Sequence, residues 1–177
     1  MQTFIALLRG INVSGKNLIK MAPLAEVLTG AGLMNVRTYI QSGNIVFESE
    51  ASDDADTGLI IAENIRKEFG FIVPVRVLKQ SELKRIRDDN PFIRLHGLPG
   101  DKLHLTLLSG IPDHALVQKI AETECLPDEY IISGNAIYLN CPDGYGRTKL
   151  TNTFFENKLK VTATTRNWAT IVKLCSM

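Results

Sequence analysis

The sequence predicts an α+β fold built from two similar halves. Short segments of β-forming residues alternate with helical patterns along the whole chain of 177 residues. The segment Tyr39–Phe47 is similar to Tyr130–Tyr138, 91 residues later, and Leu7–Ile11 is similar to Leu107–Ile111, 100 residues later. Self-similarity of this kind indicates an internal repeat. The hydrophobic content of 45% is sufficient for a packed core.

The first half has the order strand, helix, strand, strand, helix, strand, followed by one more helix. Runs of β-forming residues bounded by turn residues predict the strands, at 3–8, 36–41, 45–48 and 71–78. Apolar residues at helical spacing begin after Pro23 and end at Gly32, which predicts the first helix. A second helical pattern ends at Gly70, and a short helix is expected over 81–89. This order is the split βαβ arrangement of ferredoxin-like folds.

The second half repeats this order. We expect strands at 103–108 and 161–163, a hairpin within 129–140, and helices at 113–124 and 148–158. A last helix, capped by Thr164 or Thr165, is expected to bury Trp168, Ile171, Val172 and Cys175. Proline and glycine residues between the halves mark a linker. The expected organisation is therefore a lobe at 1–90, a linker at 91–101 and a lobe at 102–177.

Composition and charge exclude several classes of protein. The proportions are not those of disordered, collagen-like or disulfide-rich chains. The net charge of +1 gives no general attraction to nucleic acid or to an anionic membrane. The apolar run Phe4–Leu8 is too short for a membrane span or a signal peptide. The three cysteines are not clustered, which predicts a reducing environment. We expect a cytoplasmic protein without a membrane partner. The charge disfavours a nucleic-acid partner, and the oligomeric state is not indicated.

The aligned repeat assigns counterparts to individual residues. Both halves contain a Ser-Gly-Asn triplet, at Ser42–Asn44 and Ser133–Asn135, which predicts the same hairpin turn in each. Gln41 aligns with Ile132, so its polar side chain belongs to one half only. His104 aligns with an apolar residue of the first strand, which predicts a packed histidine.

The first half also carries about nine extra residues after its first strand, within 12–20. Loops that a repeat does not need for its fold often carry function. Gly10–Asn17 nearly matches the phosphate-loop pattern G-x-x-x-x-G-K-[ST]. However, Asn17 replaces the hydroxyl residue that holds magnesium, and the helix is expected only near Pro23 instead of at the Gly-Lys pair. The segment therefore predicts an anion-binding loop or a solvated loop, and not a nucleotide triphosphatase.

Two basic regions lie at opposite ends of the chain. Residues 1–25 contain three basic residues and no acidic one, and residues 144–177 contain six basic residues and one acidic one. Tyr145–Lys149 is expected to open a long helix, where each basic side chain opposes the helix dipole by about 0.3–1 kcal/mol. An anion bound there would explain this placement, and a salt bridge to nearby acids is the structural alternative. Arg166 and Asn167 are expected to repeat the arrangement at the last helix.

These patterns predict a small anionic ligand, phosphorylated or nucleotide-like, in a cleft between the lobes. Two alternatives stay open. One is an RNA-binding sheet, although the basic-glycine-aromatic octamer of RNA recognition motifs is absent, and the other is an interaction module without catalysis. No acid–base pair and no metal-ligand spacing stands out, so no catalytic residue, metal or cofactor is assigned. The expected ligand contacts are Arg9, Asn12, Lys16, Asn17, Gln41, Arg147, Lys149, Arg166 and Asn167.

Several motifs in order resemble the bacterial family known as domain of unknown function 1697. They are Ala6–Val13, Gly15–Asn17, Tyr39–Asn44, Asn90–Phe92, Tyr145–Leu150 and Ala163–Trp168. Ser14 stands where the family often has glycine, which makes the loop slightly stiffer. The resemblance implies two ferredoxin-like lobes in tandem, and it implies no particular activity.

Overall fold

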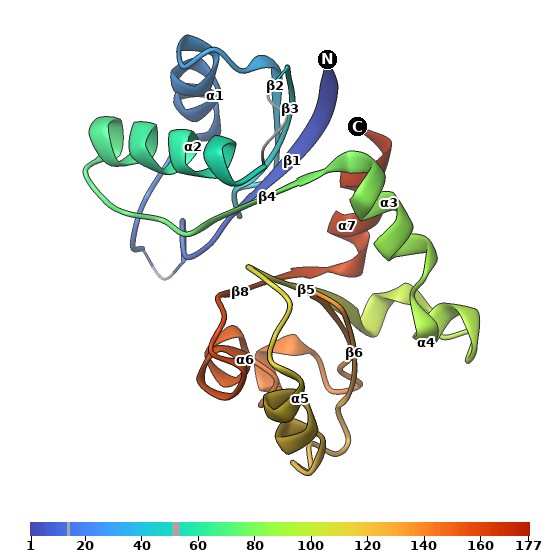
Figure 1. Cartoon of the computed structure of the whole chain (residues 1–177). Helices are drawn as coiled ribbons and strands as arrows, with labels where there is room; N and C mark the ends of the chain where they lie inside the picture. The colour runs from blue at the N-terminus through green and yellow to red at the C-terminus, as the bar shows by residue number, and fades with distance from the viewer. Residues whose placement is uncertain (14, 51–53) are drawn as a thin grey trace. The chain divides into compact units, whose positions relative to one another are not determined.

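The structure is a computed structural model that describes residues 1–13, 15–50 and 54–177. Ser14 of the loop discussed above therefore lies outside the described residues. The chain divides into two compact units, one formed by Met1–Lys84 with Leu174–Met177 and the other by Arg85–Lys173. Each unit contains one four-stranded sheet with helices (Figure 1). The fold is thus a mixed α+β fold with two sheets, as expected.

The first unit contains an antiparallel sheet with the strand order β2-β3-β1-β4. Its strands are β1 (Gln2–Leu8), β2 (Met34–Tyr39), β3 (Asn44–Ser49) and β4 (Val75–Lys79). The strand expected over 71–78 begins only at Val75, because Pro74 has no N–H to donate to the ladder. The central strand β1 is buried on both faces, since consecutive residues such as Ile5 and Ala6 have no exposed surface.

The helices α1 (Met21–Gly30) and α2 (Asp54–Phe69) lie on one side of this sheet (Figure 1). The core beneath them contains Phe4, whose ring stacks on that of Phe47 with 5.7 Å between centroids. The helix α3 (Gln80–Asp88) follows β4 directly. Gln80 Nε2 donates to the carbonyl oxygen of Leu174 at 3.0 Å, which ties the C-terminal residues to this unit.

The second unit contains an antiparallel sheet with the strand order β6-β7-β5-β8. Its strands are β5 (Leu103–Leu108), β6 (Glu129–Ser133), β7 (Ala136–Asn140) and β8 (Ala163–Asn167). The helices α5 (His114–Ala121) and α6 (Asn152–Leu159) lie on one side of it (Figure 1). A core that contains Leu108, Ile137 and Phe155 fills the space between them. The segment expected as a linker contains the short helix α4 (Pro91–Arg94) and the turn η1 (Gly100–Lys102). The lobe boundaries stay a prediction.

The last helix, α7 (Trp168–Ser176), differs from the expectation in its cap and in part of its buried face. Thr164 and Thr165 lie inside β8 and are not caps. The side chain of Asn167 caps the helix instead, since its Oδ1 accepts from Thr170 N at 2.8 Å. Trp168, Ile171 and Cys175 are buried as predicted, whereas Val172 is 43% exposed and Leu174 is buried in its place.

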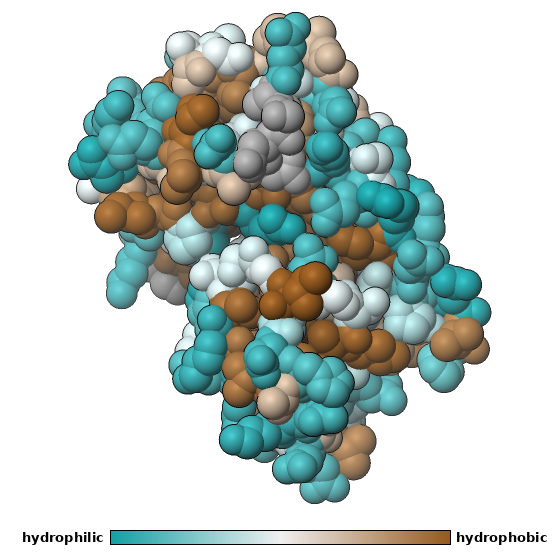
Figure 2. All heavy atoms as spheres, viewed as in Figure 1, coloured by the Kyte–Doolittle hydropathy of each residue, from teal (hydrophilic) through white to brown (hydrophobic). Residues whose placement is uncertain are grey.

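The surface mixes polar and apolar side chains. On the face shown in Figure 2, hydrophilic residues surround smaller apolar areas. Exposed aliphatic residues such as Leu59, Ile72 and Leu126 are separate in the sequence, which is usual for folded proteins. Across the described ranges, no helix combines the length and the apolar character that a membrane crossing requires.

Candidate functional site

The described residues of the loop between β1 and α1 are anchored at both ends. Ile11 and Ile19 are buried in the core of the first unit. Asn12 N donates to the carbonyl oxygen of Asn17 at 3.1 Å. Further out, Val13 and Lys16 form an isolated antiparallel bridge, in which Lys16 N donates to the carbonyl oxygen of Val13 at 3.0 Å. The loop therefore presents the exposed side chain of Lys16 from a defined backbone.

The side chains of Asn12 and Asn17 maintain this loop. Asn12 Nδ2 donates to the carbonyl oxygens of Ile19 at 2.9 Å and Gln41 at 2.8 Å. Asn12 Oδ1 accepts from Ile19 N at 2.9 Å. Asn17 Nδ2 donates to the carbonyl oxygen of Gly10 at 3.0 Å. Both asparagines have a left-handed backbone, with φ of 53° and 49°, which asparagine tolerates better than most residues. Both donors of Asn12 are thus engaged within the protein.

The turn between β2 and β3 packs against this loop. Gly43 has φ of +77°, and a Cβ at this position would lie 2.7 Å from Ile11 Cδ1 and 2.7 Å from Leu8 Cβ. The carbonyl oxygen of Gly43 accepts from Leu8 N at 2.8 Å. Gln41 is exposed, and its carbonyl oxygen accepts the Asn12 bond. Only a residue without a side chain allows the turn to approach the loop this closely.

The two hairpin turns are not equivalent, which corrects the prediction from the repeat. In the first unit Tyr39 pairs with Asn44, so the turn contains residues 40–43. In the second unit Ser133 pairs with Ala136, so only residues 134 and 135 form the turn. Gln41 therefore has no counterpart in Ile132, which lies within β6.

Two segments are consequently longer in the first unit than in the second. The connection from β1 to α1 runs over 9–20, against 109–113 between β5 and α5, and the β2–β3 turn is the longer of the two turns. The Asn12–Gln41 hydrogen bond joins these two segments. The structure thus brings the side chain of Asn12 to the backbone of Gln41. Arg9 is half-buried where β1 ends, and its N–H donates to the carbonyl oxygen of Pro74 at 3.0 Å.

Arg147 and Lys149 do not lie at a helix start, which corrects the expectation for 145–149. Arg147 ends the short turn η2 (Tyr145–Arg147), Lys149 follows in a loop, and both are exposed. The helix α6 begins only at Asn152, where Thr151 Oγ1 accepts from Phe154 N at 3.2 Å. The helix-dipole argument therefore does not apply to these two cations.

Arg166 and Asn167 lie at the end of β8 and not in the first turn of α7. Burial lowers the pKa of the Arg166 guanidinium to about 10, and the nearby phenol of Tyr145 acts in the opposite direction. Arg166 Nη1 donates to the carbonyl oxygen of Thr165 at 2.9 Å. Because Asn167 caps α7, its side-chain oxygen has a structural role.

Sequence reasoning missed an aromatic pair in the second unit. The rings of His104 and Tyr145 stack with 4.8 Å between centroids and 25° between planes. His104 lies on β5 opposite Asn167 of β8. Burial lowers the pKa of His104, and a hydrogen bond to the Lys102 carbonyl opposes this effect. The signal in the sequence was a histidine at a position where the other half has phenylalanine.

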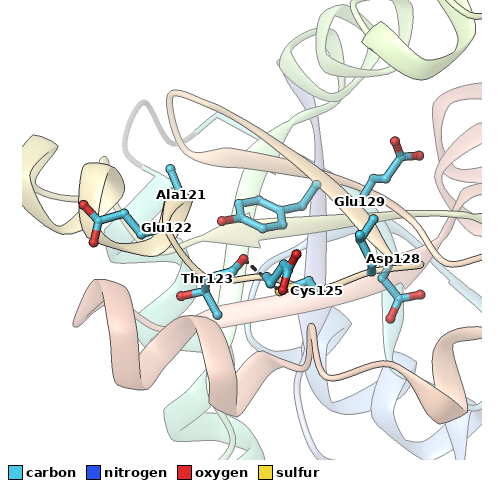
Figure 3. Close-up of a pocket in the computed structure, with 9 residues that line it drawn as sticks. Ala121, Glu122, Thr123, Cys125, Asp128 and Glu129 are labelled. Atoms are coloured by element: carbon cyan, nitrogen blue, oxygen red, sulfur yellow. Dashed lines mark hydrogen bonds between the residues drawn. The ribbon is translucent and has the colours of Figure 1, made fainter.

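A cavity of about 460 Å³ lies at the end of α5, and Figure 3 shows residues that line it. Its lining residues are Ala121, Glu122, Thr123, Glu124, Cys125, Leu126, Asp128, Glu129 and Tyr130. Glu122 and the pair Asp128 and Glu129 lie at opposite ends of the cavity. The carboxylates disfavour an anion here. Burial, and then Asp128, raise the pKa of the Cys125 thiol, whereas Lys149 lowers it. The neutral thiol donates to the carbonyl oxygen of Thr123 at 3.5 Å and is not prepared to act as a nucleophile.

The fold and these sites define a two-unit α+β protein with cations displayed on loops. The chain belongs to the family described as "Protein of unknown function (DUF1697)", whose model matches residues 1–138. Among solved structures it is similar to "conserved bacterial protein SP0830 from Streptococcus pneumoniae", with 24% identity and a TM-score of 0.80. That match covers 100% of this chain and 98% of the other. No curated protein matches the chain. A likeness at this identity shows the fold alone.

Proposed function

We propose that the first unit binds a small anionic ligand, phosphorylated or nucleotide-like, at the loop that follows β1. The observation that carries this proposal is the hydrogen bond between Asn12 and Gln41, which joins the two segments that are longer in this unit than in the other. Neither addition is needed to build the sheet, because the second unit has the same strand order without them. Their mutual contact therefore favours a shared function.

Lys16 and Arg9 are the proposed cations of this site. Lys16 is exposed on the bridged part of the loop, and Arg9 is half-buried where β1 ends. The first 25 residues contain no acidic side chain. One charge-assisted hydrogen bond contributes about 1.5–3 kcal/mol, so two contribute about 3–6 kcal/mol. This corresponds to dissociation constants between millimolar and tens of micromolar.

The amide side chains receive different roles in this proposal. Asn12 and Asn17 are positioning residues, because their Nδ2 groups already bind backbone carbonyls of the loop and the turn. The exposed side chain of Gln41 is the amide proposed to contact the ligand. A loop held in its binding conformation loses less entropy on association than a free one.

A titration of the whole chain with inorganic phosphate, pyrophosphate and phosphorylated metabolites, followed by calorimetry, tests the proposal. We expect Lys16→Ala and Arg9→Ala each to weaken binding about 10- to 100-fold. Lys119→Ala, which removes an exposed lysine of α5, is the matched control and should bind normally. Absence of binding, or equal affinity in all variants, would contradict the proposal.

We further propose that the two units descend from one duplicated ferredoxin-like lobe. Their strand orders, β2-β3-β1-β4 and β6-β7-β5-β8, correspond one to one. Gly43 and Gly134 both have a positive φ, each in the turn that joins the second and third strands of its unit. Duplication predicts the same correspondence in other family members, and halves with different strand orders would contradict it.

A cytoplasmic location is proposed on the state of the thiols. Cys125, Cys141 and Cys175 form no disulfide in the part of the chain that the structure describes, and the last two are buried. Free buried thiols are typical of proteins from reducing compartments. Cell fractionation tests the location, and recovery outside the cytoplasm would overturn it.

A further inference from the structure

We propose that Arg76 and Arg9 together hold the phosphate group of the ligand, on the face of the first sheet that is turned away from α1 and α2. Arg76 lies on β4, and Arg9 directly follows the neighbouring strand β1. The site shares Arg9 with the function proposed above, so it rests on that proposal for one of its two cations. Arg76 is a new binding residue, and the pair of arginines restricts the charged group that the ligand carries.

The pairing of the strands places the two arginine side chains on the same face. Arg76 pairs with Leu7, whereas the next residue, Val77, belongs to the core beneath the helices. Successive side chains of a strand point to opposite faces, so Arg76 points away from that core. The ladder continues by one bond, from Arg9 N to the carbonyl oxygen of Pro74 at 3.0 Å. Arg9 is therefore on the same face as Leu7 and is a diagonal neighbour of Arg76, with about 7–8 Å between their Cα atoms.

The guanidinium of Arg76 lacks the acceptors that a covered arginine requires. Its side chain is only 21% exposed, and its Nε is buried and has no acceptor within residues 1–13, 15–50 and 54–177. Its ion-pair partner is Glu82 of α3, with 4.0 Å between Arg76 Nη2 and Glu82 Oε1. A charge-assisted hydrogen bond of this type measures about 2.7–2.9 Å, so the carboxylate balances charge without satisfying the donors. A buried donor without an acceptor requires an explanation, and a bound anion supplies one.

The second unit shows that the sheet does not require an arginine at this position. Arg76 pairs with Leu7 in the first unit. The corresponding pair in the second unit is Leu107 and Thr164, and Thr164 is buried. Removing a charged group from water costs free energy that an ion pair returns in full only with excellent geometry. A binding role explains this cost, whereas packing of the sheet does not.

A phosphate group matches this pair of cations. The planar fork of arginine binds two oxygens of a phosphate or carboxylate at once. A phosphate dianion offers enough oxygens and charge for two arginines, whereas a carboxylate carries a single negative charge. The exposed part of the Arg76 side chain provides access from solvent. We therefore expect inorganic phosphate and phosphate monoesters to bind better than carboxylates.

Calorimetric titration of the whole chain with inorganic phosphate and with acetate, at equal ionic strength, tests this site. We expect phosphate to bind at least about 10-fold more tightly than acetate. Arg76→Lys keeps the charge but removes the fork, so it should weaken phosphate binding about 10-fold. The matched control is Arg37→Lys, which changes an exposed arginine on β2, at the opposite edge of the same sheet, and should bind normally. Equal affinity of Arg76→Lys and the wild type for phosphate, or equal affinity of the wild type for both anions, would overturn the proposal.

The same titration separates this site from the loop that follows β1. If Lys16→Ala weakens phosphate binding and Arg76→Lys does not, the loop binds the anion and the role of Arg76 is refuted. If only Arg76→Lys weakens it, the site on the sheet is supported without the loop. A wild type that does not bind inorganic phosphate would overturn the role of Arg76, whereas the loop is still decided by its titration with phosphorylated metabolites.

Thermal unfolding tests the alternative that Glu82 is the only partner of Arg76. Without phosphate, we expect Arg76→Met to melt at the temperature of the wild type or above it, because an apolar side chain replaces an incompletely paired charge. Phosphate should raise the melting temperature of the wild type and not that of Arg76→Met. If Arg76→Met and Glu82→Gln lower the melting temperature equally, and phosphate acts on all three proteins alike, Arg76 belongs to a structural ion pair and the proposal is wrong.

Discussion

The side-chain amide of Asn12 donates a hydrogen bond of 2.8 Å to the carbonyl oxygen of Gln41. The same amide donates to the carbonyl oxygen of Ile19 and accepts from its N–H. One side chain thus closes the loop that follows β1 and attaches it to the β2–β3 turn. The proposed anion site depends on this arrangement, because it sets the backbone from which Lys16 projects.

Replacing Asn12 should therefore destabilise the first unit. Asn12→Ala removes three hydrogen bonds and places alanine at φ of 53°. At about 1 kcal/mol for each bond, and with strain of about 1 kcal/mol, the free energy of unfolding should fall by roughly 3–4 kcal/mol. Urea titration measures it. Asn12→Gly removes the same hydrogen bonds without the strain, so its free energy of unfolding should fall less. A loss below about 0.5 kcal/mol in both variants would contradict the structural role of the Asn12 side chain.

Gly43 and Gly134 both lie in hairpin turns with a positive φ, so the same alanine substitution can be compared in two different surroundings. Gly43→Ala places a Cβ 2.7 Å from atoms of Ile11 and Leu8 at φ of +77°. Gly134→Ala meets nothing within 4 Å at φ of +59°. The second change should cost only the conformational strain, about 1 kcal/mol, whereas the first should cost at least about 1–3 kcal/mol more through overpacking. Thermal unfolding of the two variants checks this, and equal losses would show that the contact with the loop is not tight.

The strand pattern could be predicted because apolar β-forming runs are local. The strand β5 has the predicted bounds, Leu103–Leu108, since glycine and proline residues precede it and Ser-Gly follows it. The strand β8 was predicted too short, because Thr164–Asn167 carry no apolar alternation and resemble a helix cap. Its position is set by pairing with β5, for example Thr106 with Thr165, which is not visible in the local sequence.

The strand orders of the two units correspond one to one, but the alignment predicted from the sequence is off by one residue in the third strand. Phe4 pairs with Phe47, and the residue that corresponds to it, His104, pairs with Leu139 and not with Tyr138. Because side chains alternate along a strand, a shift of one residue changes the face. Phe47 therefore belongs to the core of its unit, whereas the Tyr138 hydroxyl donates to the carbonyl oxygen of Ile86 at 2.9 Å.

The candidate sites were predicted only in part. The cations were found because their charge is visible in the sequence, and the loop was found because one half lacks it. The internal hydrogen bonds of Asn12 and Asn17 depend on turn lengths that sequence similarity did not resolve. The stack of His104 on Tyr145 joins residues far apart in the chain, so it could not be derived from local spacing.

The thiol of Cys125 should react slowly with alkylating reagents at neutral pH. Burial and Asp128 raise its pKa, so less reactive thiolate is present at a given pH than for a free cysteine. The rate of iodoacetamide labelling should continue to increase up to a higher pH than it does for free cysteine. Cys125→Ser should remove the fastest-labelled site, because Cys141 is buried and its pKa is raised to about 11. Labelling at pH 7 as fast as that of free cysteine would contradict this prediction.

His104 should make the stability of the protein depend on pH in the acidic range. Burial lowers its pKa in the folded state below the ordinary value of 6.5. The unfolded chain therefore binds the proton more readily, and the stabilising contribution is present above pH 6.5 and is lost as the pH falls through the folded-state pKa. The melting temperature of the protein should fall between pH 7 and pH 5 by more than that of His104→Phe, which cannot be protonated. An equal fall in both would show that other groups govern the acid response.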